Sequence, residues 1–146
     1  MWTALVSYVS HLMGNQFGQF CHALKHGQYS KARELYFGSK KLREAVLSKV
    51  NESLGPEHED NSVLHYAAQY KLERMYVELL NSNRSPGVPD MKNNQRRNCF
   101  HLICLNTVNS EVALSMLEIT VNFLKSQKLD VAHLLAEKDE VRMVHV

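Results

Sequence analysis

Cysteines and histidines are the residues of this chain that could do metal or nucleophilic chemistry. Cys99, His101 and Cys104 lie close together, but on a helix only His101 and Cys104 share a face, and no fourth zinc ligand is evident. Cys21 and His22 could form a nucleophile–base pair, yet adjacent helical residues do not face each other. We therefore interpret these residues as packing residues and expect no catalytic site, metal or cofactor.

Composition narrows the class of protein further. A chain of 146 residues with 45% apolar content can bury one core. The net charge of +2 is small and its basic residues are scattered, which argues against nucleic acid as the main partner. Three cysteines without a pairing pattern fit a reducing compartment, so we expect a cytoplasmic location, with the nucleus as a second one.

The first residues of the chain are apolar, but the run is shorter than the roughly 20 residues that a membrane span needs. It also lacks the basic region and the small-residue cleavage site of a secretory signal. We interpret residues 1–16 as a leader, flexible or in a short helix, and expect no membrane span.

Apolar residues recur at helical spacing in several short segments, and no segment shows the period-two alternation of a strand. The pattern predicts an all-α fold. Ser30 is predicted to cap a helix over 31–37, with Gly27 ending the helix before it. The further segments predicted to be helical are 42–50, 62–70, 72–80, 99–105 and 110–124, with a last short apolar stretch at 129–135.

A unit of short helix, tight turn, longer helix and polar connection occurs three times. The middle copy, SVLHYAAQYKLERMYVELL, resembles the ankyrin consensus through Ser62, Leu64, His65, Ala67, Ala68, Leu79 and Leu80. A weaker copy contains Phe100 and His101, and His101 follows His65 by 36 residues against the roughly 33 of ankyrin repeats. In that family the histidine and the hydroxyl residue fix the turn by hydrogen bonds, so resemblance gives this role to His65 and Ser62.

The predicted fold is therefore a short ankyrin-type helical repeat array with degenerate and inserted helices. Residues 17–50 form a degenerate first repeat plus an extra helix, and 51–61 a polar linker. Residues 62–139 form two ankyrin-like repeats with a long connection, and 140–146 are a divergent tail.

The order of these segments over residues 13–139 resembles the N-terminal repeat region of ankyrin repeat and IBR domain-containing proteins, which are RING-between-RING ubiquitin ligases. Their catalysis needs closely spaced cysteine pairs, and this chain has no Cys-x-x-Cys pair. The resemblance thus implies that any ligase activity belongs to a longer parent chain. We expect this chain to be a truncated fragment or isoform, translated from Met1 or Met13.

The resemblance also implies a non-catalytic role in binding another protein, a ligase substrate or regulator, through the concave face of the array. The residues that it places on this face are Lys25, His26, Asn61, Gln69, Tyr70, Gln95, Arg97, Leu105 and Asn106. Tyr70 and Leu105 are the expected apolar centre. The alternative is a structural or autoinhibitory fragment without independent function, because repeat proteins need neighbours and caps.

Overall fold

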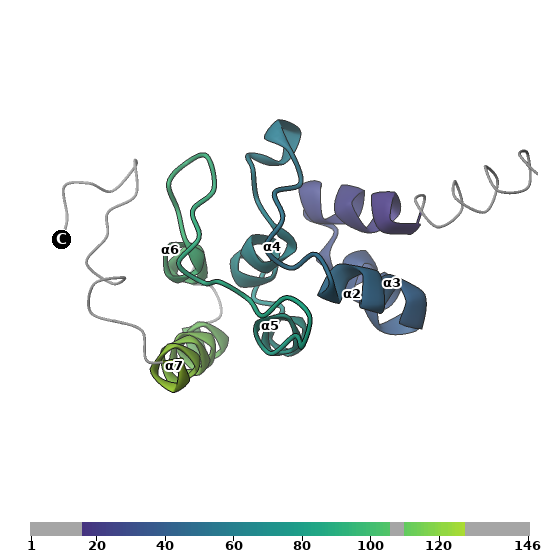
Figure 1. Cartoon of the computed structure of the whole chain (residues 1–146). Helices are drawn as coiled ribbons and strands as arrows, with labels where there is room; N and C mark the ends of the chain where they lie inside the picture. Colours follow the sequence, from purple (N-terminus) through teal and green to yellow (C-terminus); the bar gives the residue numbers. More distant parts are fainter. Residues whose placement is uncertain (1–15, 106–109, 128–146) are drawn as a thin grey trace, which may run out of the picture.

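The computed structural model describes residues 16–105 and 110–127, and all regular elements in these ranges are helices (Figure 1). Residues 16–25 are helical and are followed by α2 (Tyr29–Gly38), α3 (Lys40–Leu47) and the short 3₁₀ helix η1 (Pro56–His58). The chain continues through α4 (Val63–Gln69), α5 (Glu73–Leu80), α6 (Cys99–Cys104) and α7 (Ser110–Ser126). The prediction of an all-α helical repeat array is confirmed.

The helices are arranged as stacked pairs. α4 packs against α5 and α6, and α7 packs against both α5 and α6. Two loops project from the same side of the array, next to α4 and α6 (Figure 1). We call residues 51–61 the first finger and residues 89–98 the second finger. The first finger was predicted as a polar linker; it contains η1 and closes through a hydrogen bond from Leu54 N to Asn61 O at 2.9 Å.

The turn between paired helices has the same hydrogen bonds in the first and second copies. Gln28 N donates to Ala23 O at 2.8 Å, and 44 residues later Leu72 N donates to Ala67 O at 3.0 Å. This is the bond of a Schellman-type helix ending, which satisfies a carbonyl that the helix leaves without a partner. Helix 16–25 and α2 therefore form a copy of the pair α4–α5, despite their poor agreement in sequence.

A residue in the left-handed conformation closes each of these turns. It is Gly27 in the first copy, with φ 70°, and Lys71 in the second, with φ 57°. Glycine adopts this conformation without steric cost, whereas a lysine must be held there by other interactions.

The beginnings of α4 and α6 are closed by equivalent capping boxes. Ser62 Oγ accepts from His65 N at 3.2 Å, and His65 Nδ1 accepts from Ser62 N at 2.9 Å. In α6, Asn98 Oδ1 accepts from His101 N at 3.1 Å, and His101 Nδ1 accepts from Asn98 N at 3.0 Å. Histidine at N3 thus does the work that glutamate does in the usual capping box.

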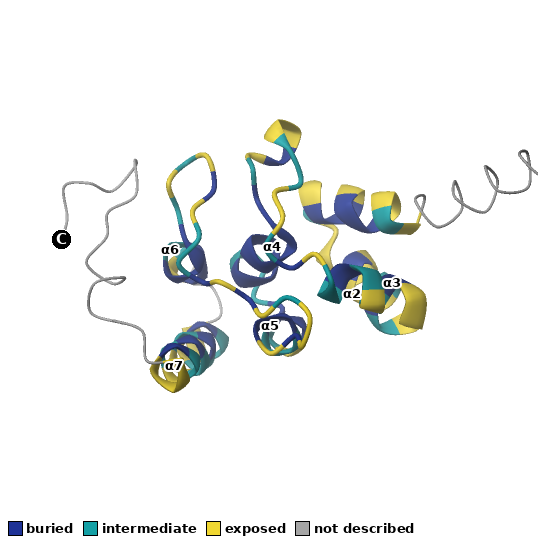
Figure 2. Cartoon of the chain, in the orientation of Figure 1, coloured by how far each residue is buried: buried dark blue, intermediate teal, exposed yellow. Residues whose placement is uncertain are grey.

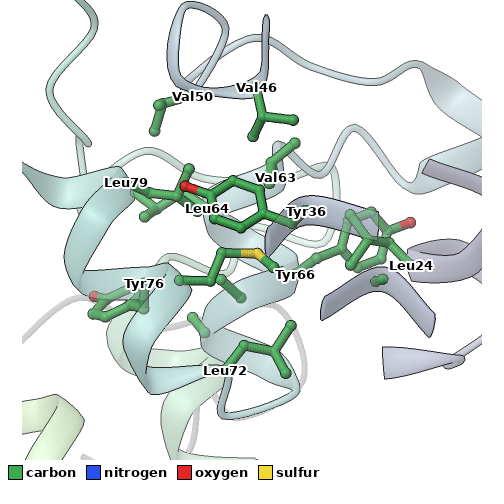
Figure 3. Close-up of a cluster of buried hydrophobic side chains, with 14 of the residues drawn as sticks. Leu24, Tyr36, Val46, Val50, Val63, Leu64, Tyr66, Leu72, Tyr76 and Leu79 are labelled. Atoms are coloured by element: carbon green, nitrogen blue, oxygen red, sulfur yellow. The ribbon is translucent and has the colours of Figure 1, made fainter. Parts of the chain in front are cut away.

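The second copy lies at the centre of the core (Figures 2 and 3). Side chains from four elements meet there: Tyr36 from α2, Val46 from α3, Leu64 from α4, and Leu79 from α5, all fully buried. Val50, just after α3, is buried beside them. The inserted helix α3 packs against α2, and its buried residues belong to the same core cluster as those of α4 and α5.

The predicted start of α2 is wrong by two residues, and so is its predicted cap. α2 begins at Tyr29, so that Ser30 lies inside the helix, and the cap position is taken by Gln28 without a side-chain hydrogen bond. Gln28 N completes the Schellman turn of the preceding helix, and Gln28 O accepts from Ala32 N at 3.0 Å, so α2 begins directly after the turn. The predicted leader up to residue 15, the apolar stretch 129–135 and the tail 140–146 lie outside the described residues.

Candidate protein-binding face

The residues predicted to contact a partner occupy different environments. Lys25 and His26 are exposed at the end of the first helix, and Gln69 and Tyr70 are half-buried at the end of α4. Leu105 is half-buried just after α6, and Asn106 lies outside the described residues. The two helix ends are adjacent in space, because the Tyr70 hydroxyl donates to Leu24 O at 2.8 Å.

Asn61 does not belong to a contact surface. Its residue is only 3% exposed, and its side-chain oxygen accepts a hydrogen bond from Asn93 Nδ2 at 2.8 Å. Asn94 N donates to Glu59 O at 2.9 Å beside it. Asn61 therefore joins the two fingers, and its predicted role as a contact residue is corrected to that of a structural residue.

Gln95 and Arg97 lie half-buried on the second finger. Asn93 shapes this finger, since its Oδ1 accepts from Gln95 N at 2.9 Å and from Arg97 N at 3.1 Å. Arg97 Nη1 in turn donates to Gln95 Oε1 at 3.1 Å. The organising residue, Asn93, was missed by sequence reasoning, although asparagine in a polar connection is a typical turn former.

Three tyrosines meet at the junction of the first two helix pairs. The Tyr66 and Tyr70 rings are stacked, with centroids 5.9 Å apart and planes at 11°. The Tyr29 ring lies 6.3 Å from that of Tyr70 and its residue is 49% exposed. Burial, followed by the charge of Glu59, raises the pKa of Tyr70. Tyr29 was not predicted as a contact residue; its position just after the Gly27 turn is the signal in the sequence.

The stacked tyrosines also hold the first finger. His58 Nδ1 lies 2.8 Å from the Tyr66 hydroxyl, with its ring edge-on to the Tyr66 ring. Burial raises the pKa of Tyr66 to about 12, so this hydroxyl is protonated near neutral pH. Burial also lowers the pKa of His58. The neutral forms of both groups fit a hydrogen bond between the hydroxyl and the ring nitrogen.

Lys71 connects the second repeat to the end of α6. Its ammonium group donates to the carbonyl oxygens of Gln69 at 3.1 Å, Leu102 at 3.3 Å and Leu105 at 2.8 Å. Burial lowers its pKa. Carbonyls at a helix C-terminus lack internal donors and attract cations, so Lys71 stabilises the end of α6. Sequence reasoning missed this role.

The residues of the predicted repeat motif are in the core. Leu64, Ala67, Ala68, Leu79 and Leu80 are fully buried, as is Ser62. Phe100 is buried against α7, and His101 is half-buried.

His65 is 1% exposed, and its Nε2 lies 2.7 Å from Met91 O in the second finger. Because Nδ1 accepts from Ser62 N, Nε2 carries the proton and donates it to Met91 O. Burial lowers the pKa of His65, in agreement with a neutral ring.

The buried cysteines Cys21 and Cys99 are in environments that disfavour the thiolate. Burial raises the pKa of Cys21 to about 11 and raises that of Cys99 still further. Cys104 is exposed. Within residues 16–105 and 110–127, no group of three or more histidine, cysteine or carboxylate side chains could hold a metal ion. The described helices also include none that is long and apolar enough to cross a membrane.

Paired helices, capping boxes and projecting fingers define the class of this chain as an ankyrin-type helical repeat array. Over 93 residues, 64% of the chain, it is 29% identical to ankyrin repeat and IBR domain-containing protein 1 of Homo sapiens and 30% identical to the Mus musculus protein of that name. The matched segment is only 8% of the length of these relatives. No family model matches the chain, and no solved structure matches it.

Proposed function

We propose that this chain is a non-catalytic protein-interaction module that brings a substrate or regulator to a ubiquitin ligase of the RING-between-RING type. The observation that carries this proposal is the pair Tyr29 and Tyr70, which leaves aromatic surface open to solvent beside exposed Lys25 and His26. The similarity to part of the ankyrin repeat and IBR domain-containing proteins supports the link to ubiquitination. A reducing compartment, the cytoplasm or nucleus, is the proposed location.

The tyrosines are suited to binding because they are already fixed. Tyr70 is held by stacking on Tyr66 and by its hydrogen bond to Leu24 O. A partner that contacts a rigid aromatic ring loses little conformational entropy at the interface. Tyrosine and arginine are also enriched among the residues that dominate binding energy.

The test is capture of proteins from a cell extract by the immobilised chain, followed by mass spectrometry. We expect Tyr29→Ala to remove specific partners, because it takes away exposed aromatic surface. Val88→Ala, which shortens another exposed apolar side chain away from this junction, is the control and should retain them. Equal capture by both variants would contradict the proposed face.

The link to ubiquitination needs its own experiment. The chain is fused to a RING-between-RING catalytic module, and ubiquitin transfer to a captured partner is measured in a purified system. The wild-type fusion should modify the partner, and the Tyr29→Ala fusion should modify it much less. If the wild-type and Tyr29→Ala fusions transferred ubiquitin at equal rates, recruitment to the ligase would be contradicted. Only the protein-binding part of the proposal would then remain.

One observation favours the alternative of a structural or autoinhibitory segment. Leu114 on α7 is 66% exposed, so part of an apolar helix is uncovered in the described chain. Thermal unfolding followed by circular dichroism separates the two functions. A single cooperative transition supports an autonomous binding module, whereas a broad and gradual loss of helix supports a segment that needs neighbouring repeats.

A further inference from the structure

The last helix pair of the described array, α6 and α7, has a neighbour on one side only. α7 packs against α5 and α6, and the Thr120 hydroxyl on α7 lies 2.7 Å from that of Tyr76 on α5. The pair lies at the end of the array opposite helix 16–25, and no further described element lies beyond it (Figure 1). The outer side of this pair therefore meets no other helix within the residues that the structure describes.

An apolar stripe on α7 extends beyond the part that is covered. Leu114, Leu117 and Val121 are spaced by three and four residues and so share one side of the helix. Leu117 and Val121 are half-buried against the small cluster of Phe100 and Leu124. Leu114, at the beginning of the stripe, is 66% exposed. An exposed leucine that continues a half-buried apolar stripe is a surface that a further apolar segment can cover.

The sequence supplies an apolar segment directly after α7. Only Gln127 and Lys128 separate the end of the helix from the run LDVAHLL at 129–135, in which five of the seven residues are apolar. Neither the repeat motif nor the proposed binding face uses this run. A segment joined to the helix by so short a link has a high effective concentration beside it.

The segment is long enough to reach the whole stripe. The distance from Gln127 back to Leu114 is about 20 Å along an α-helix, whereas the eight residues 128–135 span up to about 26 Å when extended. Residues 2–13 are also apolar in sequence, but they precede helix 16–25 at the other end of the array (Figure 1). The position in the chain therefore favours residues 129–135 as the cover.

We propose that residues 129–135 pack on the stripe of Leu114, Leu117 and Val121 and cover the outer side of the pair α6–α7. The chain then closes the last face of its own array, and the Tyr29–Tyr70 junction stays available to a partner. This inference does not depend on the proposed binding function, because it concerns the opposite end of the array.

The stability of the full chain in urea tests whether Leu114 is covered. Glutamine has nearly the helix propensity of leucine, so Leu114→Gln changes an apolar contact rather than the helix. If residues 129–135 cover Leu114, this substitution should raise the equilibrium constant of unfolding about tenfold. Val88→Gln, at a 41% exposed apolar position outside α7, is the control and should change this constant less than about twofold.

Substitutions in the segment test which residues provide the cover. Leu134→Gln together with Leu135→Gln should also raise the unfolding constant about tenfold. Met143→Gln together with Val144→Gln changes another adjacent apolar pair and is the matched control, with an expected change below about twofold. Once residues 134 and 135 are substituted, Leu114→Gln should add less than about twofold, because residues in contact have non-additive effects.

A disulfide between introduced cysteines tests the contact directly. Cys104 is exposed and is replaced by serine, whereas Cys21 and Cys99 are buried. Under mild oxidation, Leu114→Cys should form a disulfide with a second cysteine introduced by Leu134→Cys or Leu135→Cys. Lys40→Cys, at an exposed position on α3, is the control for Leu114→Cys and should form none.

Several results would overturn the inference. It fails if Leu114→Gln is as mild as Val88→Gln, if its effect is the same with and without the substitutions at 134 and 135, or if neither position forms the disulfide. Stability that rises with protein concentration would instead identify a second copy as the cover. Coupling of Leu114→Gln to Leu5→Gln would identify residues 2–13. None of these results alters the capture experiment with Tyr29→Ala, so the two proposals can fail separately.

Discussion

The two junctions between successive helix pairs are built differently. At the first, tyrosine hydroxyls make the connections: Tyr70 donates to Leu24 O, and Tyr36 donates to Glu78 Oε1 at 2.9 Å. At the second, His65 and Lys71 reach backbone carbonyls of the second finger and of the end of α6. The first junction leaves aromatic surface exposed, whereas the second uses its polar groups to fix the position of the next pair.

This difference suggests a division of roles. A group bound to backbone carbonyls holds its neighbour whatever side chains that neighbour carries. Tyr70 makes one such bond at the first junction, whereas His65 and Lys71 make three across the second, so the second junction is suited to stability. The half-exposed tyrosines at the first junction provide both a connection and a surface for contact. Substitutions at the second junction should therefore lower stability most, and substitutions of exposed residues at the first should affect binding.

The largest effect is expected from His65→Ala. The substitution removes the capping bond to Ser62 N and the bond to Met91 O, and it leaves a cavity in a fully buried site. The free energy of unfolding, from urea denaturation, should fall by about 3 kcal/mol. His101→Ala in the equivalent cap is the control, and because His101 is half-buried its loss should cost about 1 kcal/mol. Equal losses of unfolding free energy at the two sites would show that the bond from His65 to Met91 O adds nothing to stability.

Lys71 is expected to have the next largest effect, and two substitutions separate its contributions. Lys71→Ala loses the three carbonyl bonds but keeps a side chain in the left-handed conformation, so stability should fall by about 2 kcal/mol. Lys71→Gly loses the same bonds but relieves the backbone, and should cost about 1 kcal/mol less than Lys71→Ala. If the free energy of unfolding of the glycine variant, from urea denaturation, equalled or exceeded that of the wild type, the bonds of Lys71 to the end of α6 would make no net contribution to stability.

Acid should weaken the protein below the ordinary pKa of histidine. The folded-state pKa values of His58 and His65 are lowered from 6.5, mainly by burial. The unfolded chain thus binds more protons, and the stability conferred by the neutral rings is complete above pH 6.5 and is lost as the pH falls from there towards the folded-state values.

Urea denaturation at a series of pH values measures this dependence. His58→Asn removes the group at the first junction, and the remaining slope below pH 6.5 then reports His65. An unchanged free energy of unfolding across this range would mean that neither ring is held neutral.

Local patterns in the sequence predicted the helices and the motif, but not how neighbouring copies connect. Ser62, His65 and the two alanines have an identifiable spacing, because a capping box and close helix packing are satisfied within one repeat. The bonds of Lys71 and Asn61 join residues more than 30 positions apart and depend on the stacking of whole helix pairs. No local periodicity encodes them. Tyr29 was missed for the same reason, because its ring forms an aromatic surface only together with Tyr70, which lies 41 positions away in the sequence.

The smallest effect is expected from Asn98→Ser, which makes the second capping box more like the first. Asn98 is fully buried, and its Nδ2 has no hydrogen-bond partner, whereas its Oδ1 accepts from His101 N. Serine keeps an acceptor for the cap and removes the unsatisfied amide, at the cost of a smaller side chain. Because an unsatisfied buried donor costs about 1–3 kcal/mol and the lost volume offsets part of this, a net gain of up to about 1 kcal/mol is expected in urea denaturation. Asn98→Ala, which removes the cap as well, should instead destabilise the chain by about 1 kcal/mol. If serine proved as harmful as alanine, the carboxamide nitrogen of Asn98 would have to contribute to stability, and the two capping boxes would differ in more than their acceptor atom.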